Sequence, residues 1–511
     1  MKKRSYWTVL SDDILTNKKL VLCVLFTAIL CFGFPITNFS IGVDDSAGNY
    51  YLYGSAQGTM IQQGRLLHVL LSRLTGAIEF LPFFTDFMGA ALFSASALLY
   101  CGFFLYMTEG KLSSASLISF ACLYISNSIL VEKLIYHLDV IPTMLSYCFS
   151  PLALVYGYRF VKEKKTPLFF KTVAALIPAL ASYESFATLY FCGVFAIFLL
   201  EILVNGEKKT FLSILLEGLR YAAALIAAMV IYYSLVHLVQ VLTGQAGIFI
   251  RYNYWAESDR GLVGTFLHLT EKFIGMLRDF YLAQYLPVRL FLLFSLLGAL
   301  VSLFWSVRQK NIWVVFCFVC LWLGNFLIHY VSGNIMTRTS QTFCFFGGFV
   351  AILLLEAVGS KVLLKTLVGC AMALVVFVQS ADMTRWFYND YARYQKETFV
   401  IDSVAAALAG EYDLSKSVVF AGTRDTGYLD TAVYPGRQVN GNAMVYWSID
   451  AWGDKTQPFV KEIFRMHGYD FILSPTPEQY DAAHEKAEAM AVWPQKGSIQ
   501  EFQDFIVVNF G

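Results

Sequence analysis

The sequence predicts an α-helical polytopic membrane protein with a small α/β domain at its C-terminal end. Three observations predict this class: of the 511 residues, 57% are hydrophobic, 16% are aromatic and only 15% are charged. Soluble chains average about 25% charged residues, and soluble cores of ordinary size cannot hide 45 Phe and 30 Tyr. Composition therefore excludes collagen, a disordered chain and a cytosolic enzyme. The net charge of +1 gives no field that attracts nucleic acid, so we expect no nucleic-acid partner.

Eleven apolar segments approach the roughly 20 residues that a helix needs to cross a bilayer. They cover residues 19–36, 86–108, 113–131, 140–160, 168–181, 186–204, 215–242, 288–306, 312–331, 340–358 and 362–380. Ionisable residues lie at the ends of these segments, and the segment centres are almost uncharged. Ion-coupled transporters need such groups at mid-membrane depth, so the pattern disfavours transport.

The basic residues predict the orientation of the chain in the membrane. Lys18 and Lys19 precede the first apolar segment and no small-residue cleavage site follows Pro35, so we interpret this segment as a span and not as a cleaved signal peptide. Alternate loops then carry the basic clusters, which are Lys2 to Arg4, Lys18-Lys19, Lys111, Lys162 with Lys164-Lys165, Lys208-Lys209, Arg308 with Lys310, and Lys361 with Lys365. The positive-inside rule places these loops in the cytoplasm. The N-terminus is then inside, the C-terminus outside, and the protein lies in the cytoplasmic (inner) membrane with its functional face outward.

On this orientation residues 1–380 form a transmembrane domain whose long outer loops are 37–85 and 243–287. The first of these loops contains two adjacent acids, Asp44 and Asp45, shortly after the first span. One carboxylate of such a pair can accept a proton from an incoming hydroxyl while the other holds an orienting group or a cation. An Asx turn that closes the helix end is the alternative interpretation. We expect no cofactor, and a divalent metal at this pair stays open.

A surface helix is predicted over residues 62–74, where apolar residues fill one broad face. Arg65 at its start either extends its head to the headgroup layer or binds phosphate. The next outer turns bring Glu132, His137 and Asp139 together within eight positions, and then Glu184. These residues are candidates for the wall of a site, although a solvated turn and an N-cap at Asp139 explain them equally.

The second long outer loop opens with Arg251 and Trp255 in a mixture of aromatic and polar residues that suits sugar binding. Aromatic belts at the membrane interface have the same appearance. Apolar residues spaced by three and four from Phe266 to Phe280 predict a second surface helix. Arg338 is a lone cation in a later outer loop and is either an anchor or a ligand of a lipid phosphate.

Residues 381–511 are more polar and predict an extracytoplasmic α/β domain. Helical patterns cover 384–410, 459–467 and 477–491, and strand patterns cover 417–422, 470–474 and 505–510. No motif for a nucleotide, zinc, serine-hydrolase or calcium site occurs in a supporting context.

Several short motifs, taken in order, resemble those of the bacterial type II O-antigen glucosyltransferases, which are multi-span enzymes with the C-type glycosyltransferase fold. The similar stretches are Val-Asp-Asp at 43–45, Gln-Gly-Arg-Leu-Leu at 63–67, Met-Leu-Ser-Tyr at 144–147 after Asp139, Ala-Ser-Tyr-Glu-Ser at 181–185, Trp-Pro-Gln-Lys-Gly-Ser-Ile at 493–499, and Phe-Ile-Val-Val-Asn-Phe at 505–510. The resemblance implies transfer of a hexose, in this family glucose, from a polyprenyl-phosphate sugar to an O-antigen or another cell-surface glycan.

The residues suggest how such an inverting glycosyltransferase would work. Asp44 or Asp45 would act as the general base, which contributes about 10²- to 10⁴-fold in rate. The cations Arg65, Arg251 and Arg338 would bind the lipid phosphate of the donor. The remaining candidates would contact the acceptor or the sugar, and they are Glu132, His137, Asp139, Glu184 and Trp255.

Two other functions remain open from the sequence. The chain would be a flippase or exporter of lipid-linked saccharides with an outer glycan-binding domain if a cationic cavity lay at mid-membrane depth. It would be a glycan-binding scaffold without chemistry if Asp44 and Asp45 were dispensable.

Overall fold

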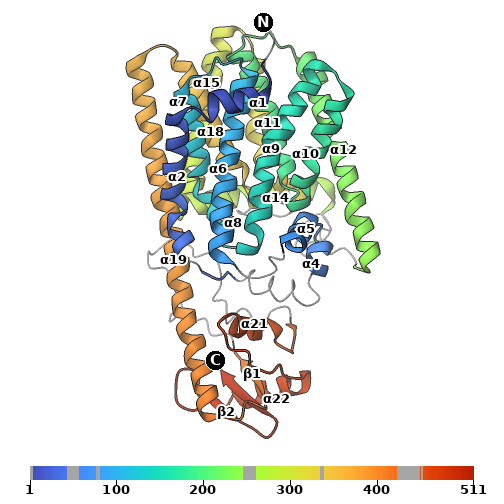
Figure 1. Cartoon of the computed structure of the whole chain (residues 1–511), viewed down its shortest axis with the longest axis vertical. Coiled ribbons are helices and arrows are strands. Elements are labelled where there is room, and N and C mark those ends of the chain that lie inside the picture. Colours follow the sequence, from blue (N-terminus) through green and yellow to red (C-terminus); the bar gives the residue numbers. More distant parts are fainter. Residues whose placement is uncertain are drawn as a thin grey trace.

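The computed structural model describes residues 4–38, 40–42, 57–75, 81–245, 260–333, 339–422, 449 and 453–511. Long helices stand side by side in a bundle, and a smaller C-terminal region lies beyond one end of it, joined to the bundle by α19 (Figure 1). The helices of the bundle are α1 (Tyr6–Val9), η1 (Leu10–Ile14), α2 (Lys18–Thr37), α4 (Gln57–Gln62), α5 (Leu66–Thr75), α6 (Pro82–Met107), α7 (Ser114–Ile125), η2 (Ser128–Leu130), α8 (Val131–Leu134), α9 (His137–Glu163), α10 (Thr166–Ser182), α11 (Phe186–Leu203), α12 (Phe211–Thr243), α14 (Gly261–Leu282), α15 (Leu286–Gln309), α16 (Trp313–Gly324), α17 (Leu327–Ser332), α18 (Thr342–Val358) and α19 (Val362–Glu411).

The bundle has the composition of a membrane protein. Seven helices in the described part of the chain are long and apolar enough to cross a membrane, namely α2, α6, α9, α11, α12, α15 and α19. Four shorter apolar helices coincide with the remaining predicted segments, at Ser114–Leu130, Thr166–Ser182, Trp313–Gly324 and Thr342–Val358. The prediction of a mostly helical chain with membrane-compatible helices is confirmed.

The helices divide into an inner and an outer set. α11 and α18 are buried almost all round, which is the pattern of a helix at the centre of a bundle. α2, α12 and α15 instead expose large apolar side chains such as Ile29, Ile226 and Leu300. A soluble protein rarely exposes so much apolar surface, and lipid is the environment that accommodates it.

Three predicted segments are interrupted where a local bond or backbone conformation ends the helix. The surface helix predicted at 62–74 is split at Gly64, whose φ of +76° suits glycine and not a helix interior. In the segment 113–131 the helix α7 ends at Ile125. The Asn127 side-chain oxygen then accepts a hydrogen bond from the Ile129 backbone amide, which begins the short η2 turn. The segment 312–331 is split into α16 and α17 at Asn325. Hydropathy does not report such breaks because the flanking residues stay apolar.

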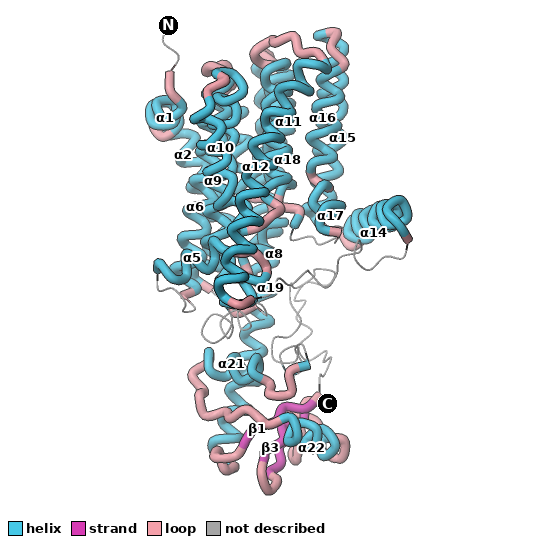
Figure 2. The backbone as a smooth tube through the Cα atoms, turned by 90° about the vertical axis from the view of Figure 1, so that its right-hand side faces the viewer, coloured by secondary structure: helices cyan, strands magenta, loops and turns pink. Residues whose placement is uncertain are grey.

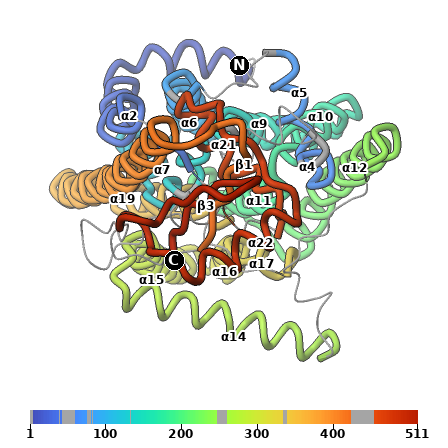
Figure 3. Tube along the Cα trace, turned by 90° about the horizontal axis from the view of Figure 1, so that it is seen from below, coloured from blue at the N-terminus to red at the C-terminus, as the bar shows by residue number. Residues whose placement is uncertain are grey.

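The surface helix α14 lies across the bundle and not along it. It projects from the side of the molecule in Figure 2 and follows its rim in Figure 3. Thr265, Leu269 and Phe273 are buried, and the Phe273 ring packs at a tilt against Phe326 of the bundle, with 4.4 Å between ring centroids. The opposite face exposes Leu267 and other apolar side chains, as expected of an interfacial helix.

The C-terminal region contains a three-stranded sheet in the order β1-β3-β2, with β1 (Ser417–Ala421) parallel to β3 (Phe505–Asn509) and β2 (Ile499–Glu501) antiparallel to it. Helices α21 (Pro458–Met466) and α22 (Pro477–Ala487) pack beside the sheet with the end of α19. One detail of the sequence prediction is wrong, because residues 470–474 contribute only an isolated bridge, Ser417 to Leu473. The predicted helix at 384–410 is confirmed, and it is continuous with the apolar segment before it, since α19 runs unbroken for 50 residues. At 1.5 Å per residue α19 is about 75 Å long, which is enough to leave the bundle and reach the sheet.

Candidate functional site

Polar and charged side chains gather at the two ends of the bundle, which we name the Asp139 end and the Glu201 end. The Asp139 end faces the C-terminal region, and the Glu201 end lies beside the N-terminal helices, as the course of α9 shows in Figure 1. Most of the described candidate residues lie at the Asp139 end.

An arginine and a histidine of α5 and its preceding turn meet an aspartate at the start of α9. Arg65 Nη1 donates to Asp139 Oδ2 at 2.9 Å, and His68 Nε2 lies 3.1 Å from the other carboxylate oxygen. His68 is one helical turn from Arg65, so both side chains point to the same place. Burial lowers the pKa of the His68 imidazole, although the nearby Asp139 carboxylate opposes this. The histidine is therefore largely neutral at pH 7.

A second cation joins this group through an aromatic ring. The Lys133 ammonium lies 3.2 Å from the centre of the Tyr183 ring, and the Arg65 guanidinium lies 4.9 Å from the same ring. Lys133 is only 5% exposed. An aromatic ring stabilises cations over its face through its quadrupole. Two permanent cations, Arg65 and Lys133, thus gather near the Asp139 carboxylate. We call these three residues with His68 and Tyr183 the Asp139 cluster.

Glu184 lies next to the cluster, and the Tyr232 hydroxyl connects it to Gly64, where the chain turns before α5. The Tyr232 hydroxyl lies 3.1 Å from the Gly64 carbonyl oxygen, to which it donates, and 3.4 Å from Glu184 Oε1. Burial raises the pKa of the Glu184 carboxyl, against the opposing effect of hydrogen bonds from Tyr233 and Tyr232. A raised pKa lets this carboxyl keep its proton to a higher pH than an exposed glutamate does.

The segment Ser40–Gly42 is held by two further groups at this end. His137 Nε2 lies 2.6 Å from the Ser40 carbonyl oxygen, and His137 Nδ1 lies 2.8 Å from Asp86 Oδ1. From α19, Arg393 donates to the Ile41 carbonyl oxygen at 2.9 Å. The sequence pattern predicted His137 in the wall of a sugar site, and in the structure it contacts the backbone of the first outer loop.

Asn389 is a polar residue of α19 that the sequence analysis did not single out. It is fully buried, and neither atom of its carboxamide has a hydrogen-bond partner among the described residues. The indole nitrogen of Trp386, one turn earlier, is also buried without a hydrogen-bond partner among the described residues. An unsatisfied buried polar group costs about 1–3 kcal/mol, so both are candidates to bind the hydroxyls of a ligand.

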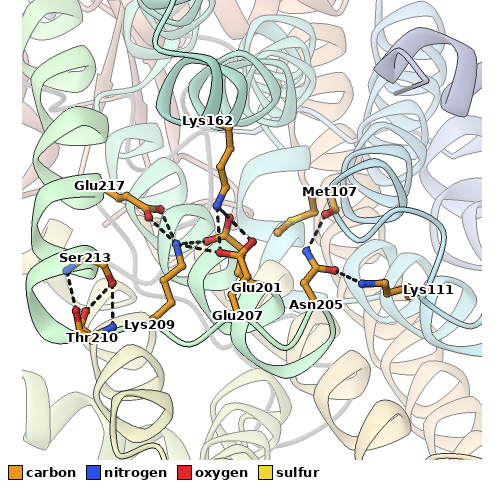
Figure 4. A network of polar contacts seen from close by, with 10 residues as sticks. All are labelled: Met107, Lys111, Lys162, Glu201, Asn205, Glu207, Lys209, Thr210, Ser213 and Glu217. Atoms are coloured by element: carbon orange, nitrogen blue, oxygen red, sulfur yellow. Dashed lines mark hydrogen bonds and ion pairs between the residues drawn. The ribbon is translucent and has the colours of Figure 1, made fainter. Parts of the chain in front are cut away.

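The Glu201 end contains a different network, shown in Figure 4. Glu201 is fully buried and lies 2.5 Å from Lys162 Nζ and 2.8 Å from Lys209 Nζ. Lys209 also lies 2.6 Å from Glu217, and Glu207 completes the group. The network links α9, α11, the loop that follows α11, and α12. Every charge has an opposite partner, which is the arrangement of a structural fastener.

The other predicted site residues cannot be placed. Asp44, Asp45, Arg251, Trp255 and Arg338 lie outside the described residues, and so does the side chain of Glu132, whose backbone belongs to α8. Among the described residues, no group of three or more His, Cys, Asp or Glu side chains could hold a metal ion. The structure thus brings together Arg65, Asp139 and Glu184 of the predicted residues.

The family match concerns the part of the chain that contains this cluster. The model of the family described as glucosyl transferase GtrII matches residues 33–355, more than half of the chain. The chain belongs to the glucosyl transferase GtrII family. Neither a curated protein nor a solved structure matches it. The family relationship confirms the resemblance to the type II O-antigen glucosyltransferases and makes this chain a glycosyltransferase, with a sugar donor and a glycan acceptor.

Several residues of this candidate site were not named in the sequence analysis. His68 and Tyr183 look like ordinary members of an amphipathic helix and a polar turn, and Arg393 lies within a long helix without a motif. One signal was present, because Asp390, Arg393 and Glu397 are spaced by three and four, which places them on one helix face.

Proposed function

We propose that this glucosyltransferase is an inverting enzyme that moves glucose from a polyprenyl-phosphate sugar to an O-antigen or another cell-surface glycan. The eleven apolar segments cross the cytoplasmic membrane with the N-terminus inside, in the C-type glycosyltransferase fold. The Asp139 end and the C-terminal α/β domain then face outward. Nucleotide sugars are confined to the cytoplasm, so a donor at the outer face must arrive attached to lipid.

In the proposed reaction the acceptor hydroxyl oxygen attacks the anomeric carbon of the glucosyl group. The bond between that carbon and the phosphate oxygen breaks, and polyprenyl phosphate leaves with the bonding electrons. Asp44 or Asp45 takes the proton of the acceptor hydroxyl. Attack from the face opposite the phosphate inverts the anomeric configuration.

The observation that carries this proposal is the presence of two permanent cations, Arg65 and Lys133, in the Asp139 cluster. A phosphate group gains charge as it leaves, and preorganised cations in a site of low polarity stabilise that charge most effectively. Arg65 and Lys133 supply such cations at the Asp139 end, and Arg251 and Arg338 are proposed to join them. Glu132, His137, Asp139, Glu184 and Trp255 stay proposed contacts of the acceptor or sugar, with Asn389 added to them.

The experiment supplies membranes that contain the full chain and a surface glycan with polyprenyl-phosphate glucose labelled in the sugar. We expect label in the glycan with this donor and none with a nucleotide sugar added to the outer face. Asp44→Asn or Asp45→Asn should lower the rate at least about 100-fold. Asp12→Asn and Asp13→Asn are matched controls, because these acids are also adjacent but lie near the N-terminus, where they pair with Arg4.

The same assay separates the alternatives. Full transfer by both the Asp44 and the Asp45 variant would eliminate the proposed base. Movement of the lipid-linked sugar across the membrane without its transfer to glycan would instead indicate a flippase.

A further inference from the structure

Ser40–Gly42 is the only described piece of the first outer loop between α2 and α4 beyond Asn38, and Asp44 follows it by two residues. Ser40 and Ile41 are contacted by parts of the chain that are distant in sequence. Figure 1 shows these parts: α6 and α9 belong to the bundle, and α19 runs from the bundle to the C-terminal region. Their contacts determine where the loop leaves the bundle.

The first contact comes from the bundle and requires a shared proton. A backbone carbonyl only accepts hydrogen bonds, so His137 Nε2 must carry the hydrogen that it donates to the Ser40 oxygen at 2.6 Å. His137 Nδ1 then either donates to the Asp86 carboxylate or accepts from a protonated Asp86, at 2.8 Å. In both cases the pair holds one proton between two buried groups. Asp86 and His137 are 6% and 3% exposed, so water does not compete for it.

The second contact comes from α19. The Ser40 hydroxyl donates to Asp390 Oδ2, and Asp390 Oδ1 accepts from Arg393 Nε at 3.1 Å. Arg393 Nη2 donates to the Ile41 carbonyl oxygen, and Nη1 donates to Glu397 at 2.6 Å. Arg393 is 1% exposed. Its planar fork thus bonds two carboxylates and a backbone oxygen at once, a geometry that lysine cannot reproduce.

The third contact is apolar. The Ile41 side chain is 2% exposed and belongs to the core of the C-terminal region, with Tyr394, Val400 and Ile463 among its members. The backbone of this short segment therefore bonds to the bundle and to α19, and the Ile41 side chain packs in the core of the C-terminal region. Buried hydrogen bonds of this kind, made to both Ser40 and Ile41, favour one arrangement of the segment.

We propose that the two buried pairs, Asp86 with His137 and Asp390 with Arg393, are positioning groups for the glycosyl transfer. We call them, with Ile41, the loop mount. The mount fixes the point and direction from which the chain continues to Asp44, and it makes the C-terminal region a structural part of the active site. This inference rests on the proposed function for the role of Asp44 and Asp45. A misplacement of about 1 Å can cost about 100-fold in rate, which is the scale that the mount controls.

The experiment compares Arg393→Lys, Ser40→Ala and Ile41→Ala in the full chain. Arg393→Lys keeps the charge and loses the fork. Ser40→Ala removes one hydroxyl and is the mildest change, so it keeps the test valid if Arg393→Lys does not fold. Lys416→Met is the matched control. It breaks an ion pair of the C-terminal region, with Glu501 at 2.6 Å, and the described side-chain bonds of Lys416 include no residue of the mount.

Two readouts are measured on variants that melt within a few degrees of the wild type. Backbone amide exchange of peptides that include Ser40–Gly42 should become at least about tenfold faster than in the wild type. With polyprenyl-phosphate glucose as donor, kcat should fall at least about tenfold while KM for the donor changes less than about threefold. Lys416→Met should change neither quantity.

The outcomes separate this inference from the proposed function. Unchanged exchange in the folded variants overturns the mount, and faster exchange with an unchanged kcat overturns its positioning role. If Asp44→Asn and Asp45→Asn both retain transfer while the mount variants lose kcat, the proposed base is wrong and the mount positions another group of the loop.

Discussion

The two ends of the bundle contain charged clusters of similar size. Among the described residues, acids outnumber bases in one cluster, and bases outnumber acids in the other. At the Glu201 end, two lysines face three glutamates, and each charge has a partner within 3.5 Å (Figure 4). At the Asp139 end, two permanent cations share one carboxylate and an aromatic ring. The first arrangement pairs every charge with an opposite charge, whereas the second gathers two permanent cations near one described carboxylate, which suits an anionic ligand.

This contrast suggests that burial alone does not identify a functional cluster. Glu201 and Asp139 are both acids at helix ends, and both contact two basic side chains. The difference lies in which charges gather. A structural network stabilises the fold by satisfying its own charges, and a site for a phosphate gathers cations where the negative charge of the substrate develops.

The largest expected effect is on stability at the Glu201 end. Glu201→Gln should lower the free energy of unfolding by about 3 kcal/mol, because two lysines lose a buried partner. Glu207→Gln removes an acid of the same network that is 37% exposed and should cost less than about 1 kcal/mol. Thermal or denaturant unfolding in detergent checks both. Equal effects of the two variants would contradict the description of this network as a buried fastener.

The next effect is on catalysis at the Asp139 end. Lys133→Met should lower kcat/KM for polyprenyl-phosphate glucose about 100-fold, or roughly 2.7 kcal/mol, because it removes a cation from the proposed phosphate site. Lys162→Met is the matched control at the other end, where the same change should leave kcat/KM of the folded enzyme within about threefold. Similar losses in both variants would mean that the two ends do not differ as proposed.

Hydropathy predicted the bundle because each span is a continuous run of apolar residues in the sequence. It predicted β1 and β3 for the same reason, since each is a short apolar run. It did not predict the continuity of α19, since a polar helix beyond a span looks like a new element. The Asp139 cluster was predicted only in part. Arg65 and Asp139 were named separately, but 74 positions separate them, and only packing of α5 on α9 brings them together.

The loop mount was beyond sequence analysis for a further physical reason. Two of its bonds end on backbone oxygens of Ser40 and Ile41, and a backbone oxygen has no residue type to recognise. His137 was therefore interpreted as a sugar contact, and Asp86 only as a charge at the end of a span. Lone polar residues beside a span gain a definite role only when their partners are known.

A smaller effect is expected at the turn that carries Arg65. Gly64→Ala should destabilise the protein by about 1–2 kcal/mol, because its φ is +76° and the new Cβ would lie 2.6 Å from the Tyr232 hydroxyl oxygen. Gly218→Ala is the control, since nothing lies within 4 Å of a Cβ there and alanine favours the helix. Unfolding curves check the difference. A neutral Gly64→Ala would show that Tyr232 and the turn move without cost.

The smallest effect is a pH dependence of stability at Glu184. Burial raises the pKa of this carboxyl above its ordinary value of about 4.3, so its contribution is fully present below that value and is lost as pH rises through the folded pKa. Glu184→Gln cannot ionise, so its melting temperature should gain on the wild type between pH 5 and pH 8. Glu478 has a lowered pKa, owing first to a backbone hydrogen bond at the start of α22, and Glu478→Gln should lose on the wild type as pH rises from about 3 to 5. Parallel curves for Glu184→Gln and the wild type would mean that the Glu184 carboxyl titrates alike in the folded and the unfolded chain, so that burial does not raise its pKa.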